Sequence, residues 1–151
     1  MEDDASLSFI RHQAGNARYV FSVCTGALIC GAAGLLKGRK ATTHWSAFHL
    51  LPYFGATPVD QRVVIDGKLI TAAGVTAGLD GALLLASLLR GVIVAQQIQL
   101  GIEYAPEPPF QSGTPGTALP EVLERVRAMG SKLAEARLVT AKRVSARLKS
   151  E

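Results

Sequence analysis

Two kinds of apolar pattern follow one another along this chain. Residues 19–23, Tyr-Val-Phe-Ser-Val, form a β-branched and aromatic run that is typical of a buried strand. Residues 25–36 follow at once; they are small and apolar and predict a buried helix. A strand that is apolar throughout suits a parallel sheet that is covered on both faces. This first unit therefore predicts an α/β fold.

The rest of the chain continues the alternation of helices and strands. We predict helices over 6–14, 46–53, 79–89, 92–104 and 121–138, and strands over 40–45, 62–65 and 68–71. Asp66-Gly67 separates the last two strands and fits the type I′ turn of a hairpin. Ser46 is the expected cap of the helix that follows it. Strands that alternate with helices predict a mainly parallel sheet.

The helical segments differ in the faces that they can bury. The segment 79–89 is apolar almost all round, which predicts a fully buried helix. In the segment 121–138 four apolar residues share one face: Val122, Val126, Met129 and Leu133. The last dozen residues have little apolar material to bury, so we expect a solvated end that the core does not need. A Pro/Gly-rich stretch divides the chain into a domain over 1–118 and a basic C-terminal helical tail over 119–151.

Charge and composition limit the partners that we expect. The chain has 151 residues, 48% of them apolar, and a formal net charge of +4. Residues 1–120 hold eight basic and eight acidic residues, so the whole excess belongs to 121–151, with eight basic and four acidic. A basic tail alone is weak evidence for nucleic-acid binding, and we expect no nucleic-acid partner. Residues 19–36 are uncharged, but they divide better into a strand and a helix than into a membrane span.

Cysteine usage and the first residues indicate a compartment. Two cysteines, Cys24 and Cys30, are too few for a disulfide scaffold and are not spaced as a metal site. The chain opens Met-Glu-Asp-Asp, which is acidic where a secretory signal requires basic residues. We therefore predict a protein of the reducing cytoplasm, without a metal site.

Cys24 occupies the position with the clearest chemical signal. Ser22-Val23-Cys24-Thr25-Gly26 has the small-x-nucleophile-x-small pattern of a nucleophile elbow, placed where a strand meets a helix. A helix N-terminus favours the reactive thiolate, and the Thr25 N–H is a candidate oxyanion donor. The alternative is a buried structural cysteine. Cys30 lies on the opposite side of the predicted helix and is expected in the core.

Three further features surround this pattern. His44 closes the strand over 40–45, at an edge that lines crevices in parallel sheets, although a packed structural histidine fits as well. The segment 74–78, Gly-Val-Thr-Ala-Gly, is a plausible pocket wall and matches no nucleotide-binding loop. Asp80 is expected to act as a helix-start acid.

Several of these runs resemble the PfpI-like branch of the class I glutamine amidotransferase-like superfamily. They are Ser-Val-Cys-Thr-Gly-Ala-Leu at 22–28, the segment 33–45 ending Ala-Thr-Thr-His-Trp, and the segments 63–67 and 70–80. The block 95–110, with Ala-Gln-Gln-Ile-Gln-Leu at its start, resembles the isocyanide hydratases within that branch. The resemblance covers about residues 5–115.

The resemblance implies a fold, a reaction and a set of site residues. It implies a flavodoxin-like three-layer sandwich, incomplete at its N-terminus, with a C-terminal helix, and a cofactor-free homodimer. It implies hydration of an isocyanide to an N-substituted formamide. Cys24 is the implied nucleophile. The implied substrate-binding residues are Thr25, Gly26, His44, Val75 and Thr76.

Two departures from the family pattern modify this expectation. Thr25 stands where some relatives carry a histidine directly after the cysteine, which agrees with the hydratases. The first third of the family domain, which carries a catalytic carboxylate, has no counterpart, so we expect impaired activity. The alternative is a non-catalytic small-molecule-binding domain, related to the sensing domains of AraC-type transcription regulators.

Overall fold

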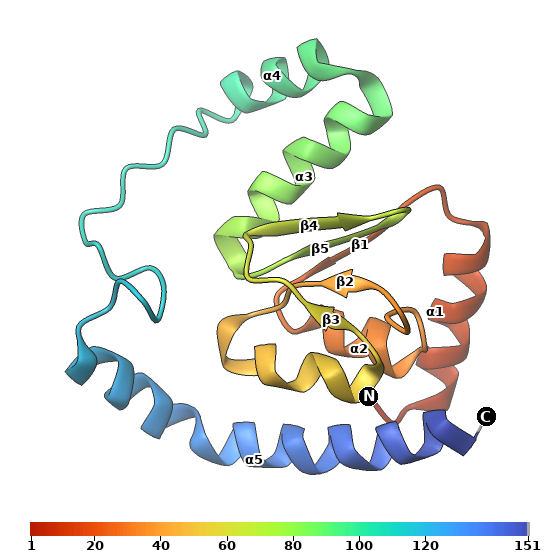
Figure 1. The fold of residues 1–151 in the computed structure, drawn as a ribbon. Helices are drawn as coiled ribbons and strands as arrows, with labels where there is room; N and C mark the ends of the chain where they lie inside the picture. The colour runs from red at the N-terminus through yellow and green to blue at the C-terminus, as the bar shows by residue number, and fades with distance from the viewer. Residues whose placement is uncertain (151) are drawn as a thin grey trace.

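Two small sheets stand at the centre of the molecule, with helices on both sides of them (Figure 1). The computed structural model describes residues 1–150. The first sheet has the strand order β1 (Val20–Val23), β5 (Leu69–Ala72), β4 (Val63–Asp66), with β1 parallel and β4 antiparallel to β5. The second sheet pairs β2 (Lys40–Ala41) with β3 (Thr57–Pro58) in parallel.

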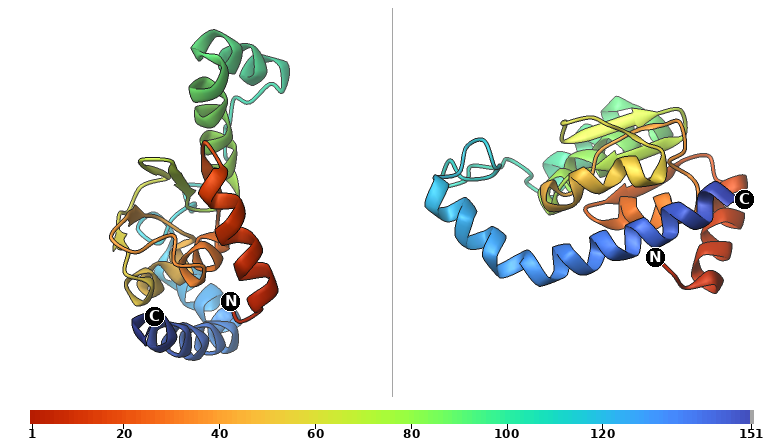
Figure 2. Two further views of the ribbon diagram at one scale, coloured as in Figure 1. Left: turned by 90° about the vertical axis from the view of Figure 1, so that its right-hand side faces the viewer. Right: turned by 60° about the horizontal axis from the view of Figure 1, so that its bottom comes forward.

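The helices form two layers around the first sheet. On one face lies α3 (Val75–Arg90), on which α4 (Val92–Gly101) folds back. On the other face, α2 (Gly26–Ala32) packs against β1, and the 3₁₀ helix η1 (Trp45–Phe54) packs against α2. The long helix α5 (Pro120–Ser150) then covers η1, while α1 (Asp4–Asn16) lies beside α2 (Figures 1 and 2). The three-layer α/β class predicted from the sequence is confirmed.

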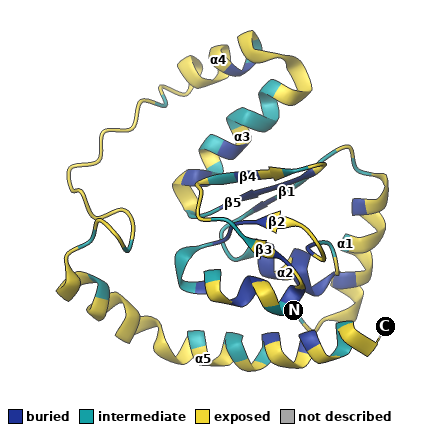
Figure 3. Ribbon diagram, viewed as in Figure 1, coloured by how far each residue is buried: buried dark blue, intermediate teal, exposed yellow. Residues whose placement is uncertain are grey.

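The hydrophobic core lies between the first sheet, α2, η1 and the C-terminal half of α5. Figure 3 shows the buried residues concentrated in these elements. Its largest fully buried apolar side chains are Leu7, Leu28, Leu36, Leu50, Leu51, Ile70 and Val144. Cys30 belongs to this core, as expected.

Close approach between α3 and β1 depends on two glycines. A Cβ atom on Gly78 would lie 2.7 Å from Cγ1 of Val23, and one on Gly81 would lie 2.7 Å from the Phe21 ring. Both distances are shorter than a tolerable contact, so only glycine lets α3 pack this closely. The start of α3 is thereby held beside the end of β1.

The expectation that the segment 79–89 is fully buried is wrong. Within α3 only Ala77 and Gly81 are buried, while Leu79, Leu88 and Leu89 are exposed. Figure 1 shows the cause, because the α3–α4 pair projects past the small sheet and only the first turns of α3 have a sheet to cover. The segment is apolar as predicted, but residues 1–150 provide no surface that covers its apolar side chains.

The expectation for the C-terminal helix is reversed in the structure. The predicted apolar face is exposed, and Met129 is 87% accessible. The expected solvated end is instead packed, with Ala141, Val144 and Ser145 buried. Arg143 and Arg147 bind Glu2 and Asp4 at 2.8 and 3.0 Å, which ties this end of α5 to the N-terminal segment. Small side chains between the charges allow the helix to approach the core.

The strand predicted over 40–45 is shorter than expected. Only Lys40 and Ala41 are strand residues, and they pair with β3, which sequence reasoning missed. Beyond them the Thr42 N–H donates to the side-chain oxygen of Thr71 at 2.9 Å. A side chain of β5 is therefore the acceptor here, and β2 does not join the first sheet through its backbone.

Two local predictions shift by one or two residues. The hairpin is present, but Asp66 pairs with Leu69, so Gly67 and Lys68 form the two-residue turn. Gly67 has φ 63° and Lys68 has a negative φ, which is the II′ pattern and not I′. The cap of η1 is His44 and not Ser46, because Nδ1 of His44 accepts from the Ser46 N–H.

No helix within residues 1–150 combines the length and apolar character that crossing a membrane requires.

Candidate active site

Cys24 lies on a sharp turn between β1 and α2, in the order that the sequence predicts. Its N–H donates to the Ala72 carbonyl at 2.9 Å, so the residue still belongs to the β1–β5 ladder. Its backbone then adopts a left-handed conformation, with φ 57°. This conformation costs a non-glycine residue roughly 1–2 kcal/mol, so the surroundings must hold it. The turn leaves Cys24 partly exposed.

Thr43 supplies one of the contacts that hold this turn. Its hydroxyl donates to the Cys24 carbonyl at 2.7 Å. Thr43 is itself buried, and its neighbour Thr42 is tied to Thr71 of β5. Sequence reasoning missed this role, because nothing local links a threonine in one strand to a carbonyl nineteen residues earlier.

Backbone donors lie directly after the thiol. Thr25 is the N-cap of α2 with φ −70° and ψ −1°, and Gly26 begins the helix. The N–H groups of both residues donate to no carbonyl of residues 1–150. Unpaired N–H groups at a helix start can stabilise a negative charge that develops beside them.

The two cysteines differ in their environment. Cys24 is partly exposed, whereas Cys30 is buried inside α2. Burial raises the pKa of the Cys30 thiol, so the thiolate form of this residue is disfavoured. Cys30 therefore belongs to the core and Cys24 to the surface at the strand end.

His44 lies at the same edge of the sheets but is engaged in local structure. Its Nδ1 accepts from the Ser46 N–H at 3.3 Å and lies 2.8 Å from the Ser46 hydroxyl. Burial, together with the charge of Arg137, lowers its pKa, so the ring is neutral at pH 7. A Cβ atom on Gly74 would lie 3.9 Å from Cδ2 of His44, so the ring borders the start of α3.

The two remaining candidate residues belong to the first turn of α3. The Val75 side chain is 79% exposed. The Thr76 hydroxyl accepts from Arg62 at 3.3 Å. Cys24, His44 and this turn follow β1, β2 and β5, so the carboxyl ends of three strands carry the candidates. Neither of two cavities in the molecule, one beside α5 and one beside Trp45, includes Cys24.

Two carboxylates, those of Asp66 and Asp80, are engaged by other groups. Asp66 accepts from the Lys40 N–H at 2.8 Å and from Arg39 at 3.3 Å. Asp80 accepts from Arg62 at 2.6 Å and from the Tyr104 hydroxyl at 2.7 Å. Asp80 is the sixth residue of α3, so the expectation of a helix-start acid is wrong.

The fold and the turn at Cys24 together define a class of protein. A cysteine on a left-handed turn between a parallel strand and a helix, in a three-layer α/β fold, is the arrangement of flavodoxin-like proteins with a nucleophile elbow. The family model described as "DJ-1/PfpI family" matches residues 1–87. The chain belongs to the DJ-1/PfpI family.

Three similar proteins place the chain within this family. "Isonitrile hydratase" of Pseudomonas putida is 53% identical over 148 residues, which cover 98% of this chain and 65% of that protein. A THiJ/PfpI family protein from Pseudomonas syringae has a TM-score of 0.87 and 43% identity, over 95% of this chain and 57% of that one. "HTH-type transcriptional regulator CdhR" of Pseudomonas aeruginosa is 33% identical over 62% of this chain and 29% of its own length. The chain thus spans less than two thirds of each relative.

Proposed function

We propose that this chain is an isocyanide hydratase-like lyase, which hydrates an isocyanide to an N-substituted formamide through Cys24. The observation that carries the proposal is 53% identity to the Pseudomonas putida isonitrile hydratase over nearly the whole chain. The elbow at Cys24 supports it, because the reaction needs an accessible sulfur nucleophile beside backbone donors.

The first step forms a carbon–sulfur bond. The Cys24 thiolate attacks the terminal carbon of R–N≡C, and a proton adds to that carbon. The product is a thioimidate, R–N=CH–S–Cys24. Negative charge develops on the former isocyanide group during the attack, and the N–H groups of Thr25 and Gly26 are the nearest donors in sequence.

The second step adds water and releases the enzyme. Water attacks the thioimidate carbon, one of its protons passes to the nitrogen, and the C–S bond breaks. Cys24 leaves as the thiolate, and the oxygen gives up its second proton, which replaces the one that the first step consumed. This oxygen becomes the formyl oxygen of R–NH–CHO. The sum is R–N≡C plus H₂O, so the reaction needs no oxidant or cofactor.

We assign substrate contact to the residues that follow the three strands. Thr25 and Gly26 adjoin the sulfur, and His44 adjoins Gly74 at the start of α3. Val75 presents an apolar surface and Thr76 a hydroxyl. Because His44 is neutral at pH 7 and its Nδ1 is engaged, we assign it positioning and not proton transfer.

Proton delivery is the step that this chain supports least. Among residues 1–150, Asp66 and Asp80 are bound to basic groups, and hydrogen bonds hold the pKa of each below the ordinary value. Loss of a positioned acid or base typically reduces turnover by about 10²–10⁴-fold. We therefore expect slow turnover, below that of the Pseudomonas putida relative by about this factor.

The test measures formamide formation from a simple alkyl isocyanide. The full chain should produce formamide, and Cys24→Ser should reduce the rate to that of buffer. Cys30→Ser is the matched control, because it removes the buried thiol and should leave the rate unchanged. Formamide formation that is equal in the wild type and in Cys24→Ser contradicts the proposal.

A second candidate is a non-catalytic binding module. The match to the Pseudomonas aeruginosa regulator, at 33% identity, favours it. For a binding module, an isocyanide or a related ligand should raise the melting temperature of both the wild type and Cys24→Ser. Neither protein should then produce formamide.

We further propose that the protein is a cytoplasmic homodimer. Exposed apolar residues on α3 and α4 support the dimer, among them Leu89, Val92 and Ile93. The need for a free Cys24 thiol supports a reducing compartment. Sedimentation should give a dimer, and Ile93→Glu should convert it to a monomer; a monomeric wild type contradicts the dimer.

A further inference from the structure

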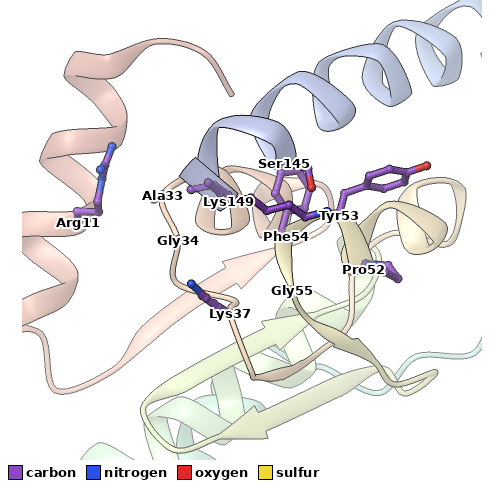
Figure 4. Close-up of a pocket in the computed structure, with 11 residues that line it drawn as sticks. Arg11, Ala33, Gly34, Lys37, Pro52, Tyr53, Phe54, Gly55, Ser145 and Lys149 are labelled. Atoms are coloured by element: carbon purple, nitrogen blue, oxygen red, sulfur yellow. The ribbon is translucent and has the colours of Figure 1, made fainter. Parts of the chain in front are cut away.

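A cavity of about 550 Å³ lies away from Cys24, between α1, the segment after α2, the end of η1 and the last turns of α5 (Figure 4). Its residues include Ala33 and Gly34, which directly follow the C-terminal end of α2, whereas Cys24 precedes the N-terminal end. Seven helical residues rise about 10 Å. The cavity is therefore separate from the candidate active site, and its volume lies within the range of small-molecule sites.

The inner surface of this cavity is mostly apolar. Ala33 and Phe54 are both only 2% exposed and form part of its wall, together with Leu148 of α5. Ser145, a buried residue of α5, adds one hydroxyl to this lining. A site of this kind favours an apolar body and offers a single polar contact beside it.

Among the described residues, the charged groups on the rim of the cavity are all positive. Arg11, Lys37 and Lys149 line it, and no aspartate or glutamate of residues 1–150 does. Figure 4 shows these residues coming from three separate segments around the hollow. Three cations so arranged repel one another, and an anion between them relieves that repulsion.

The nearby carboxylates do not neutralise this rim. Glu2 and Asp4, on the N-terminal segment, are bound to Arg143 and Arg147. Within the described part of the chain, Lys37 and Lys149 form no ion pair, and Arg11 donates only to its own helix, to the Leu7 carbonyl. The charge of the rim is thus available to a ligand.

We propose that this cavity binds a small amphipathic carboxylate, with its apolar part against Phe54 and Leu148 and its carboxylate among Arg11, Lys37 and Lys149. Both an alkyl and an aryl carboxylate have this shared chemistry. A neutral or cationic ligand of the same apolar size cannot make the attractive contact with the three cations, and we expect it to bind more weakly.

The first experiment locates and measures binding. Octanoate and 3-phenylpropionate are titrated into the ¹⁵N-labelled full chain while amide resonances are followed. The Gly34 and Gly55 amides, both at the cavity, should shift, while the Gly26 amide beside Cys24 should not. The ligand with the lower Kd, obtained from the shifts at increasing concentration, identifies the preferred apolar body. We expect Kd below about 1 mM for one of them.

The second experiment tests the charge requirement. Lys37→Glu/Lys149→Glu should raise Kd about tenfold or more, since two attractions become repulsions. Lys132→Glu is the matched control, because it is an exposed lysine of α5 outside the cavity, and it should leave Kd within about twofold. Adding about 0.1 M salt, which shortens the Debye length to about 10 Å, should weaken binding to the wild type.

Three results would overturn the proposal. One is the absence of shifts at Gly34 and Gly55 at millimolar octanoate. Another is equal binding of 1-octanol and octanoate, which would make the cavity a merely apolar hollow. The third is unchanged affinity in the doubly charge-reversed variant, whose fold is checked by its amide spectrum.

Discussion

At the scale of single residues, the backbone of Cys24 is the most constrained feature of the chain. A left-handed φ of 57° at a cysteine persists only because neighbours fix it on both sides. Ala72 accepts from its N–H and Thr43 donates to its carbonyl, at 2.9 and 2.7 Å. These contacts hold the backbone of a partly exposed cysteine, whereas Cys30 is buried in the core.

This difference between the two thiols predicts their reactivity. Under native conditions iodoacetamide should alkylate Cys24 much faster than Cys30, because Cys24 is partly exposed while burial raises the Cys30 pKa. Peptide mapping after limited labelling measures the ratio.

Two variants sharpen this experiment. Thr43→Val removes the donor to the Cys24 carbonyl and should change the alkylation rate of Cys24 but not of Cys30. Cys30→Ser should leave labelling at Cys24 unaltered. Labelling of Cys30 ahead of Cys24 would contradict the assignment of the elbow.

At the scale of elements, a polar cluster joins the hairpin to both projecting helices. Arg62 precedes β4, Asp80 belongs to α3 and Tyr104 follows α4. Asp80 accepts from both partners, and Arg62 also donates to Thr76. The cluster therefore fixes the start of α3, which borders His44, and anchors the chain beyond α4.

Stability should depend on pH through Asp80. Burial alone raises the pKa of this carboxyl, but hydrogen bonds from Tyr104 and Arg62 outweigh it and lower the pKa below the ordinary value of 3.8. A lowered folded-state pKa contributes stability above pH about 4, and this contribution is lost as the pH falls further. Asp80→Asn should lower the melting temperature by a few degrees at pH 7, for a loss of about 1 kcal/mol.

The control for this prediction is Asp60→Asn, which changes an exposed aspartate without an ion pair among residues 1–150. The deficit of Asp80→Asn relative to this control should shrink as the pH is lowered from about 4 to 3. A deficit that stays constant over that range would show that Asp80 acts through shape and not through charge.

Elements that depend on neighbouring residues were predictable from the sequence, and those that depend on distant partners were not. The β1–Cys24–α2 unit and the β4–β5 hairpin follow from local patterns. β3 has only two residues, and nothing in them indicates pairing with Lys40 and Ala41. The site was predictable in Cys24 and Thr25, whereas the contact from Thr43 depends on how the segment after β2 is placed beside the turn after β1.

At the scale of the whole molecule, α5 connects regions that are far apart in sequence. Its first half is exposed, and its last turns complete the core with Ala141 and Val144. The ion pairs Arg143–Glu2 and Arg147–Asp4 then close the chain upon its N-terminal segment. The end of α5 is therefore part of the folded body.

Because only the last turns of α5 pack in the core, truncating a side chain there should cost more stability than truncating one in its first half. Val144→Ala removes buried apolar groups and should cost roughly 2 kcal/mol, or about 4–8 °C in melting temperature. Met129→Ala, a matched truncation on the exposed half, should change it by less than about 2 °C. Removal of residues 141–151 should lower stability more than Val144→Ala; a truncated chain as stable as the full one would contradict the packing of α5.

The contact between Glu2 and Arg143 spans 141 positions of the chain, and it bears on when folding can finish. At synthesis rates of about 5–20 residues per second, Glu2 waits roughly 7–28 s for its partner to be made. Until then η1 and α2 lack the cover that α5 later supplies. The nascent chain therefore carries an open apolar surface until the last turns of α5 have been made.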